Sequence, residues 1–145
     1  MALRIQKEST LKAPPHNLEA EQAVLGGILI EKESITKAME ILSADGGDFY
    51  HDAHAKLYRG MVSLFDRTTP IDTVTLVNLF KDSDVLSSVG GVSYIGELAE
   101  ATPTAANIAY YARIVREKAL LRRLISTATE IVSRGYEGVE SIEDF

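Results

Sequence analysis

Apolar residues recur every three or four positions along most of this chain, which is the period of an amphipathic helix. The first such segment begins near Asn17, and others are expected at about 34–42, 52–66 and 93–100. A further helix is expected after Asp72, although the alternating β-branched residues of IDTVTLV (71–77) leave a strand as the minority alternative there. No repeat or internal linker interrupts the pattern. The predicted fold class is therefore all-α, with a compact body of about five helices.

Cap residues and apolar spacing define these segments further. Asn17 and Asp72 are expected N-caps, because their side chains can accept hydrogen bonds from the first free backbone N–H groups of a helix. The apolar face of each segment is predicted to point into one core. The side chains expected inside are Leu18, Val24, Leu25, Ile28, Leu29, Ile35, Ala38, Met39, Leu42, Leu57, Met61, Leu64, Phe65, Val74, Leu76, Val77 and Phe80.

Two adjacent glycines, Gly26 and Gly27, lie inside the first predicted helix, where each costs roughly 0.5–1 kcal/mol relative to alanine. A phosphate-binding loop would need a lysine and a hydroxyl residue after the glycines, but Ile28 and Leu29 follow. The favoured interpretation is helix close-packing, in which the missing side chains let another helix backbone approach.

The longest helical segment begins with Thr102 and Pro103, a favourable start, and is expected to end at Arg134 and Gly135. Residues 104–134 would span about 46 Å at about 1.5 Å per residue. A body of about 100 residues has a radius of gyration near 13 Å, so this helix is expected to extend beyond it.

The apolar face of this long segment changes sides along its length. With about 100° between successive residues, the first half places Ile108, Tyr111, Ala112, Val115 and Ala119 on one side. The second half carries what we call the apolar stripe, predicted as an oligomer interface, on the other side: Leu120, Leu121, Leu124, Ile125, Ala128, Ile131 and Val132. A straight helix cannot direct both sides at one core, so the stripe needs a partner, either a later helix of the chain or a second copy. The alternative is a kink near Ala119 that folds the second half back onto the body.

These patterns predict a division of the chain into four parts. Residues 1–13 form a flexible N-terminal tail, 14–102 the helical body, and 103–135 the long helix as the first arm of a helical hairpin. Residues 136–145 form a turn and the truncated start of a second arm, because Ser141 with Ile142, Glu143 and Asp144 looks like a helix start. We therefore expect the chain to be a piece of a longer protein.

Charge and composition narrow the possible functions. The formal net charge is −6, and residues 1–103 carry nine Lys and Arg against fifteen Asp and Glu, which disfavours tight binding to duplex DNA. Residues 104–134 reverse this balance with six basic residues against two glutamates. The alternative function is therefore an independent helical nucleic-acid-binding module that uses a basic strip of Arg113, Arg116, Lys118, Arg122 and Arg123. The chain has no cysteine and no apolar run that could span a bilayer, which favours a cytoplasmic protein without membrane contact.

No group of residues predicts catalysis or metal binding. His51 and His54 have the spacing to share a metal ion on a helix, but no third histidine lies near them, so packing or solvated roles are favoured. Ser93 lacks the spacing of a nucleophile elbow. We expect no catalytic residue, metal or cofactor in this chain.

Four stretches together resemble the N-terminal domain of bacterial replicative DNA helicases of the DnaB family. They are PPHNLEAEQAVLGGIL, DFY followed by His54, PIDTVTL, and GGVSYIGELAEATPTAANIAYYARIVREKALLRRLI, and the resemblance covers about residues 14–145. Where the family often pairs the first glycine with another small residue, this chain has Gly27.

The resemblance implies a helical body followed by a two-helix hairpin, with the hairpins pairing to form the collar of a hexameric ring. It also implies self-association into dimers that build toward a hexamer, docking of primase and, in some systems, of a helicase loader, with little or no nucleic acid bound by this domain. The ATP and Mg²⁺ of the family belong to a separate motor domain with a phosphate-binding loop, which these 145 residues do not contain.

Overall fold

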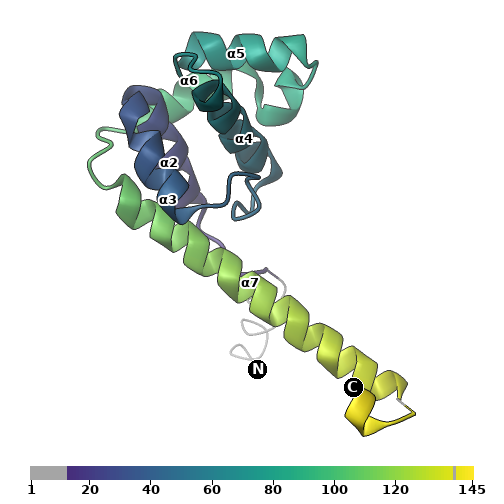
Figure 1. The fold of residues 1–145 in the computed structure, drawn as a ribbon. Coiled ribbons are helices and arrows are strands. Elements are labelled where there is room, and N and C mark those ends of the chain that lie inside the picture. Colours follow the sequence, from purple (N-terminus) through teal and green to yellow (C-terminus); the bar gives the residue numbers. More distant parts are fainter. Residues whose placement is uncertain (1–12, 139) are drawn as a thin grey trace, which may run out of the picture. The chain divides into compact units, whose positions relative to one another are not determined.

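The computed structural model describes residues 13–138 and 140–145, and in this part of the chain every assigned regular element is helical (Figure 1). The all-α prediction is confirmed, and the strand alternative for residues 71–77 is wrong. The described residues form six α-helices: α2 (Leu18–Ile30), α3 (Ile35–Ile41), α4 (Asp52–Asp66), α5 (Thr73–Asp82), α6 (Gly91–Ala101) and α7 (Ile108–Glu137). The same residues include three 3₁₀ turns: η1 (Lys32–Ser34), η2 (Leu86–Val89) and η3 (Ile142–Asp144).

The chain divides into two compact units, each of which is described by itself. His16–Ala119 forms the body unit, which holds α2 to α6 and the first half of α7. The described residues of the terminal unit are 13–15, 120–138 and 140–145. The tail predicted for residues 1–13 lies outside the described residues, apart from residue 13.

Side-chain caps fix the starts of two body helices, as the sequence predicts. Asn17 Oδ1 accepts a hydrogen bond from the backbone N–H of Ala20 at 2.9 Å. Asp72 Oδ1 accepts from the N–H of Thr75 at 2.8 Å, while Thr75 Oγ1 accepts from the N–H of Asp72 at 3.0 Å. This reciprocal capping box satisfies N–H groups that the first turn leaves without a partner.

Both predicted ends of the long helix are wrong by a few residues. Thr102 instead caps the end of α6, in an extended conformation that the following Pro103 favours, and its Oγ1 donates to the carbonyl of Leu98 at 2.9 Å. Residues 103–107 form a loop, and α7 begins at Ile108. At the other end α7 continues through Gly135 to Glu137, before Gly138 adopts a positive φ of 84°. A glycine inside a helix costs stability but does not end it, whereas one in the left-handed conformation does.

The body core lies between α2, α4, α5, α6 and the start of α7. Its fully buried side chains include Leu25, Ile28, Leu57, Met61, Leu76, Ile95 and Ile108. Three side chains expected inside are exposed instead: Leu18, Phe65 and Val74. Each lies in the first or last turn of its helix.

Helices α2 and α6 make the most extensive contact between helices of the body, and Gly26 lies within it. A Cβ atom added at Gly26 would collide with Thr102 Oγ1 and with the backbone oxygen of Leu98. At Gly27 an added Cβ would make ordinary contacts, 3.4 Å from Ile108 Cδ1 and 3.6 Å from Ala105 Cβ. The two glycines are therefore not equivalent in their surroundings.

The close packing at Gly26, which Gly27 does not share, predicts different effects for two single substitutions. Gly26→Ala should lower the free energy of unfolding by about 1–3 kcal/mol, because the methyl group has no space beside α6. Gly27→Ala is the matched control, and its better helix propensity should leave stability unchanged or raise it by up to about 1 kcal/mol. Urea unfolding of both variants measures the difference. Equal effects at the two positions would contradict this role.

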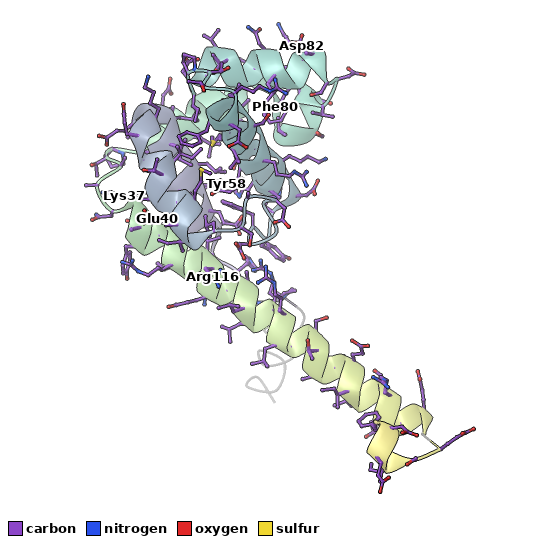
Figure 2. The ribbon with its side chains drawn as sticks, viewed as in Figure 1. Lys37, Glu40, Tyr58, Phe80, Asp82 and Arg116 are labelled. Carbon is purple, nitrogen blue, oxygen red and sulfur yellow. The ribbon has the colours of Figure 1, made fainter. Side chains whose placement is uncertain are left out.

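Tyr58 of α4 is fully buried in the body and points into its interior (Figure 2). Its ring packs against Phe49, with ring centroids 5.1 Å apart. Among the described residues its hydroxyl has no hydrogen-bond partner. Burial, and next the negative charge of Asp48, raise the pKa of Tyr58 to about 12.

This raised pKa predicts a loss of stability in alkali. Well below pH 10 the phenol is neutral in both folded and unfolded chains, so Tyr58 causes no loss of stability there. Between pH 10 and about 12 the unfolded chain loses the Tyr58 proton while the folded chain retains it, so the free energy of unfolding falls.

Tyr58→Phe should remove this part of the alkaline fall. At neutral pH its stability should stay within about 1 kcal/mol of wild type, because the removed hydroxyl makes no hydrogen bond within the described structure. Chemical denaturation from pH 8 to 11.5 provides the measurement. A variant with the same alkaline slope as wild type would show that Tyr58 does not cause it.

Candidate functional site

The apolar stripe lies on exposed positions of α7. Its six large aliphatic side chains are between 44% and 65% exposed, and Ala128 is exposed as well. The apolar residues of the first half of α7 are buried, since Ile108, Ala112, Val115 and Ala119 are at most 2% exposed. The switch from buried to exposed falls between Ala119 and Leu120, where the sequence predicts the change of face.

Helix α7 passes through this switch without interruption, over 30 residues. The helical assignment continues across Ala119, where the alternative suggested a kink. The structure brings all seven stripe residues onto one side of a regular helix, because they fall within roughly 140° when successive residues are rotated by about 100°. Their role as an oligomer interface stays a prediction.

The exposed aliphatic surface is large enough to favour association. Full burial of a Leu, Ile or Val side chain is worth about 1.5–3 kcal/mol. Because the six side chains are about half exposed, covering the rest of them would contribute roughly 4–9 kcal/mol before the entropy costs of association. Contiguous apolar surface of this kind commonly marks a protein–protein contact.

Besides the stripe, the terminal unit contains polar and cation–π contacts. Arg122 Nη1 donates to the backbone carbonyl of Pro15 at 2.9 Å. Arg134 lies over the ring of Phe145 at 5.2 Å, a cation–π contact. Ser141 caps η3 as expected at a helix start, with its hydroxyl accepting from the N–H of Glu143 at 3.3 Å.

The five residues of the proposed basic strip do not share one side of α7. At about 100° per residue, Arg113, Arg116 and Arg123 fall on one side, and Lys118 and Arg122 on the other. Arg116 donates to the backbone carbonyl of Ile41 at 3.2 Å, and Arg122 donates to that of Pro15. Two of the four guanidinium groups of the strip are thus engaged in backbone contacts.

A buried polar chain in the body unit is the feature that sequence reasoning missed. The Glu21 carboxylate on α2 accepts from the backbone N–H groups of Tyr50 at 2.7 Å and His51 at 3.3 Å. It also contacts His54 Nδ1 at 2.8 Å, and His54 Nε2 contacts the Tyr94 hydroxyl at 2.6 Å. Glu21 precedes Val24, Leu25 and Ile28 by three, four and seven residues, so its place on the apolar face of α2 was readable from the sequence.

The two histidines considered as metal ligands have different surroundings. His51 is exposed, whereas His54 is buried with both ring nitrogens against Glu21 and Tyr94. Ser93 is exposed at the start of α6, and the glycine pair lies inside α2 rather than in a phosphate-binding loop.

A groove of about 410 Å³ lies between α2, α6 and the loop before α7. Its polar wall includes Glu19, Gln22, Tyr94, Glu97 and Asn107. A second hollow of about 330 Å³ is lined by His51, Ser93, Tyr94 and Glu97, among others. Tyr94 therefore borders both, and its hydroxyl joins them to the buried polar chain.

Comparison with protein families identifies the body unit. Residues 13–117 match the family model described as the DnaB-like helicase N terminal domain. This chain belongs to that family. The resemblance noted from the sequence is confirmed over most of the chain, from the residue before Pro14-Pro15 to Glu117 of α7.

Curated relatives and a solved structure agree with this assignment. The chain is 49% identical over 92% of its length to "Replicative DNA helicase DnaC" of Bacillus subtilis (strain 168), and 48% identical over 91% to "Replicative DNA helicase DnaB" of Geobacillus stearothermophilus. It matches the "Crystal structure of the N-terminal domain of DnaB helicase from Mycobacterium tuberculosis" with a TM-score of 0.84 and 44% identity, covering 88% of this chain and 89% of that one.

The chain spans 29% of the length of each of these two curated relatives. Among the described residues, no helix combines the length and the apolar character needed to span a membrane.

Proposed function

We propose that this chain is the N-terminal oligomerisation and partner-docking domain of a hexameric replicative DNA helicase that acts in DNA replication. The proposal rests on the apolar stripe. The large aliphatic side chains of the stripe are about half exposed, whereas Ile108, Ala112, Val115 and Ala119 in the first half of α7 are buried. Membership of the DnaB-like family supplies the context of a replicative helicase.

A second copy of the chain is the partner that we expect first on the stripe. Six large aliphatic side chains on one side of a regular helix suit packing against an identical helix, as in the symmetric interfaces of homodimers. Few charged groups lie on this side of the helix, and this scarcity favours such a contact. A charged side chain at the core of an interface must be paired, or its lost solvation weakens the contact. Pairs formed in this way would be the units of the hexamer.

We assign the catalytic activity of the parent protein to its motor domain, which is separate from the present domain. ATP hydrolysis, Mg²⁺ binding and strand translocation would reside in the separate motor domain of the family, and the chain corresponds to under a third of its curated relatives. We propose that the present domain contributes assembly and docking of primase, and of a loader in systems that use one, in the cytoplasm. Titration with the primase C-terminal domain of the same organism tests the docking separately.

Direct nucleic-acid binding is the less favoured function. The chain carries a formal net charge of −6, and the basic side chains of α7 are divided between two sides of the helix. The guanidinium groups of Arg116 and Arg122 also donate hydrogen bonds to backbone carbonyls. A duplex ligand needs several phosphate contacts at once, which this arrangement does not provide.

The stripe predicts how single charges will change the association of the chain. Leu121→Asp and Ile125→Asp should each weaken dimers by at least tenfold, about 1.4 kcal/mol or more, because each would bury an unpaired carboxylate at the contact. Sedimentation velocity, or size-exclusion chromatography with light scattering at tens of micromolar, measures the shift from dimer toward monomer.

Ser126→Asp is the matched control, since Ser126 lies on the opposite side of the same helix about 190° from the middle of the stripe. It should leave the association unchanged. A wild-type chain that is strictly monomeric at these concentrations, or a control that weakens dimers as strongly as the stripe variants, would overturn self-association through the stripe.

A further inference from the structure

The hydroxyl of Tyr94 ends the buried chain of hydrogen bonds that starts at Glu21. Tyr94 is the surface member of this chain, because it lines both the groove beside α2 and the smaller hollow beside His51. The imidazole of His54 links the two ends and is fully buried. The His54 and Tyr94 rings are nearly parallel, at 10°, with centroids 5.9 Å apart, so the hydroxyl approaches the edge of the imidazole.

The partners of Glu21 fix where the proton of a neutral His54 resides. The carboxylate already accepts two backbone N–H groups, and an ionised carboxylate can only accept, so Nδ1 carries the hydrogen and donates to Glu21 Oε1. Nε2 is then a lone-pair acceptor, and the Tyr94 hydroxyl donates to it across 2.6 Å. Gln22 Nε2 donates to the same hydroxyl oxygen at 3.2 Å. In this state every member of the chain has a compatible partner.

Adding one proton at Nε2 reverses the last bond without breaking the first. The imidazolium donates from both nitrogens, so Nε2–H points at the Tyr94 oxygen, while Nδ1–H still donates to Glu21. The Tyr94 oxygen then accepts from Nε2 and from Gln22, and its own hydrogen must turn away from His54. Tyr94 lines the groove. No covalent bond other than N–H changes, and the proton comes from solvent.

The charged and titratable groups around His54 come from helices α2 and α6 and from the turn before α4. Glu21 faces it from α2, Tyr94 faces it from α6, and His51, on the turn that precedes α4, lies edge-on with ring centroids 4.6 Å apart. Glu97 lines the hollow that His51 and Tyr94 share, and Glu19 lines the groove. Both glutamates can accept a hydrogen bond from a donor in the groove wall.

We propose that Glu21, His54 and Tyr94 form a proton-operated switch, in which protonation of His54 changes the Tyr94 hydroxyl from an inward donor into a donor directed at the groove. A molecule that hydrogen-bonds Tyr94 in the groove would therefore meet a differently oriented hydroxyl above and below the pH at which His54 gains its proton. His54 acts as a positioning residue, because it sets the direction of the Tyr94 hydrogen through one bond. The switch is independent of association through the apolar stripe.

Nuclear magnetic resonance of the full 145-residue chain tests this switch, with ¹⁵N in the histidine rings and ¹³Cζ in the tyrosines. At pH 8 we expect His54 to be protonated at Nδ1 and not at Nε2. On acidification, Tyr94 ¹³Cζ should shift with the same midpoint as His54 Nε2. Tyr111 lines the same groove and provides the internal reference, which should not follow that midpoint.

Variants assign the titration to one histidine. His54→Gln should abolish the Tyr94 shift while retaining dispersed amide resonances, and His51→Gln should leave the shift in place. Three outcomes overturn the switch: a His54 ring that keeps one charge state from pH 5 to 8, a Tyr94 signal that stays constant while His54 titrates, or loss of the shift in His51→Gln. Should His54→Gln fail to fold, the wild-type and His51→Gln titrations still decide between these results.

Discussion

A straight α-helix keeps each of its sides facing one direction, and this constraint determines how α7 is used. The first half of α7 has four buried apolar residues, Ile108, Ala112, Val115 and Ala119. The aliphatic residues of the stripe lie on another side of the helix and are about half exposed. One uninterrupted element thus carries two apolar surfaces. The first belongs to the core of the body unit, and the second is exposed, which is why we propose assembly as the function of the chain.

The body unit supports this arrangement through close helix contacts and one buried polar chain. Gly26 removes the side chain that would collide with Thr102 and Leu98, and Thr102 in turn caps α6 before the loop that leads to α7. The buried charge of Glu21 is acceptable because backbone N–H groups and His54 satisfy it. The same bonds tie α2 to the start of α4 and, through Tyr94, to α6, so a polar network and an apolar core fix the same helices.

Local signals in the sequence were sufficient for most helices and for the exposed stripe. The caps at Asn17 and Asp72 and the three- and four-residue apolar spacing depend on neighbours along the chain, and these were predicted correctly. The start of α7 was not, because Thr102 and Pro103 suit a helix start equally well, whereas the bonds from Thr102 to Leu98 and Ala99 assign Thr102 to the end of α6. The roles of Glu21 and His54 depend on a contact across 33 residues, which helical spacing cannot reveal. Leu18, Phe65 and Val74 were misplaced since the pattern does not show where neighbouring helices end.

Cysteine crosslinking tests most directly whether a second copy of the chain covers the apolar stripe. The chain has no cysteine, so a single cysteine placed at each position from 120 to 132 can form a disulfide only between copies. Under mild oxidation we expect dimer yield to rise and fall with the helical period, with its maxima at stripe positions and its minima near Ser126 and Glu130. A yield that is uniform around the helix, or highest on the side of Ser126, would contradict the claim.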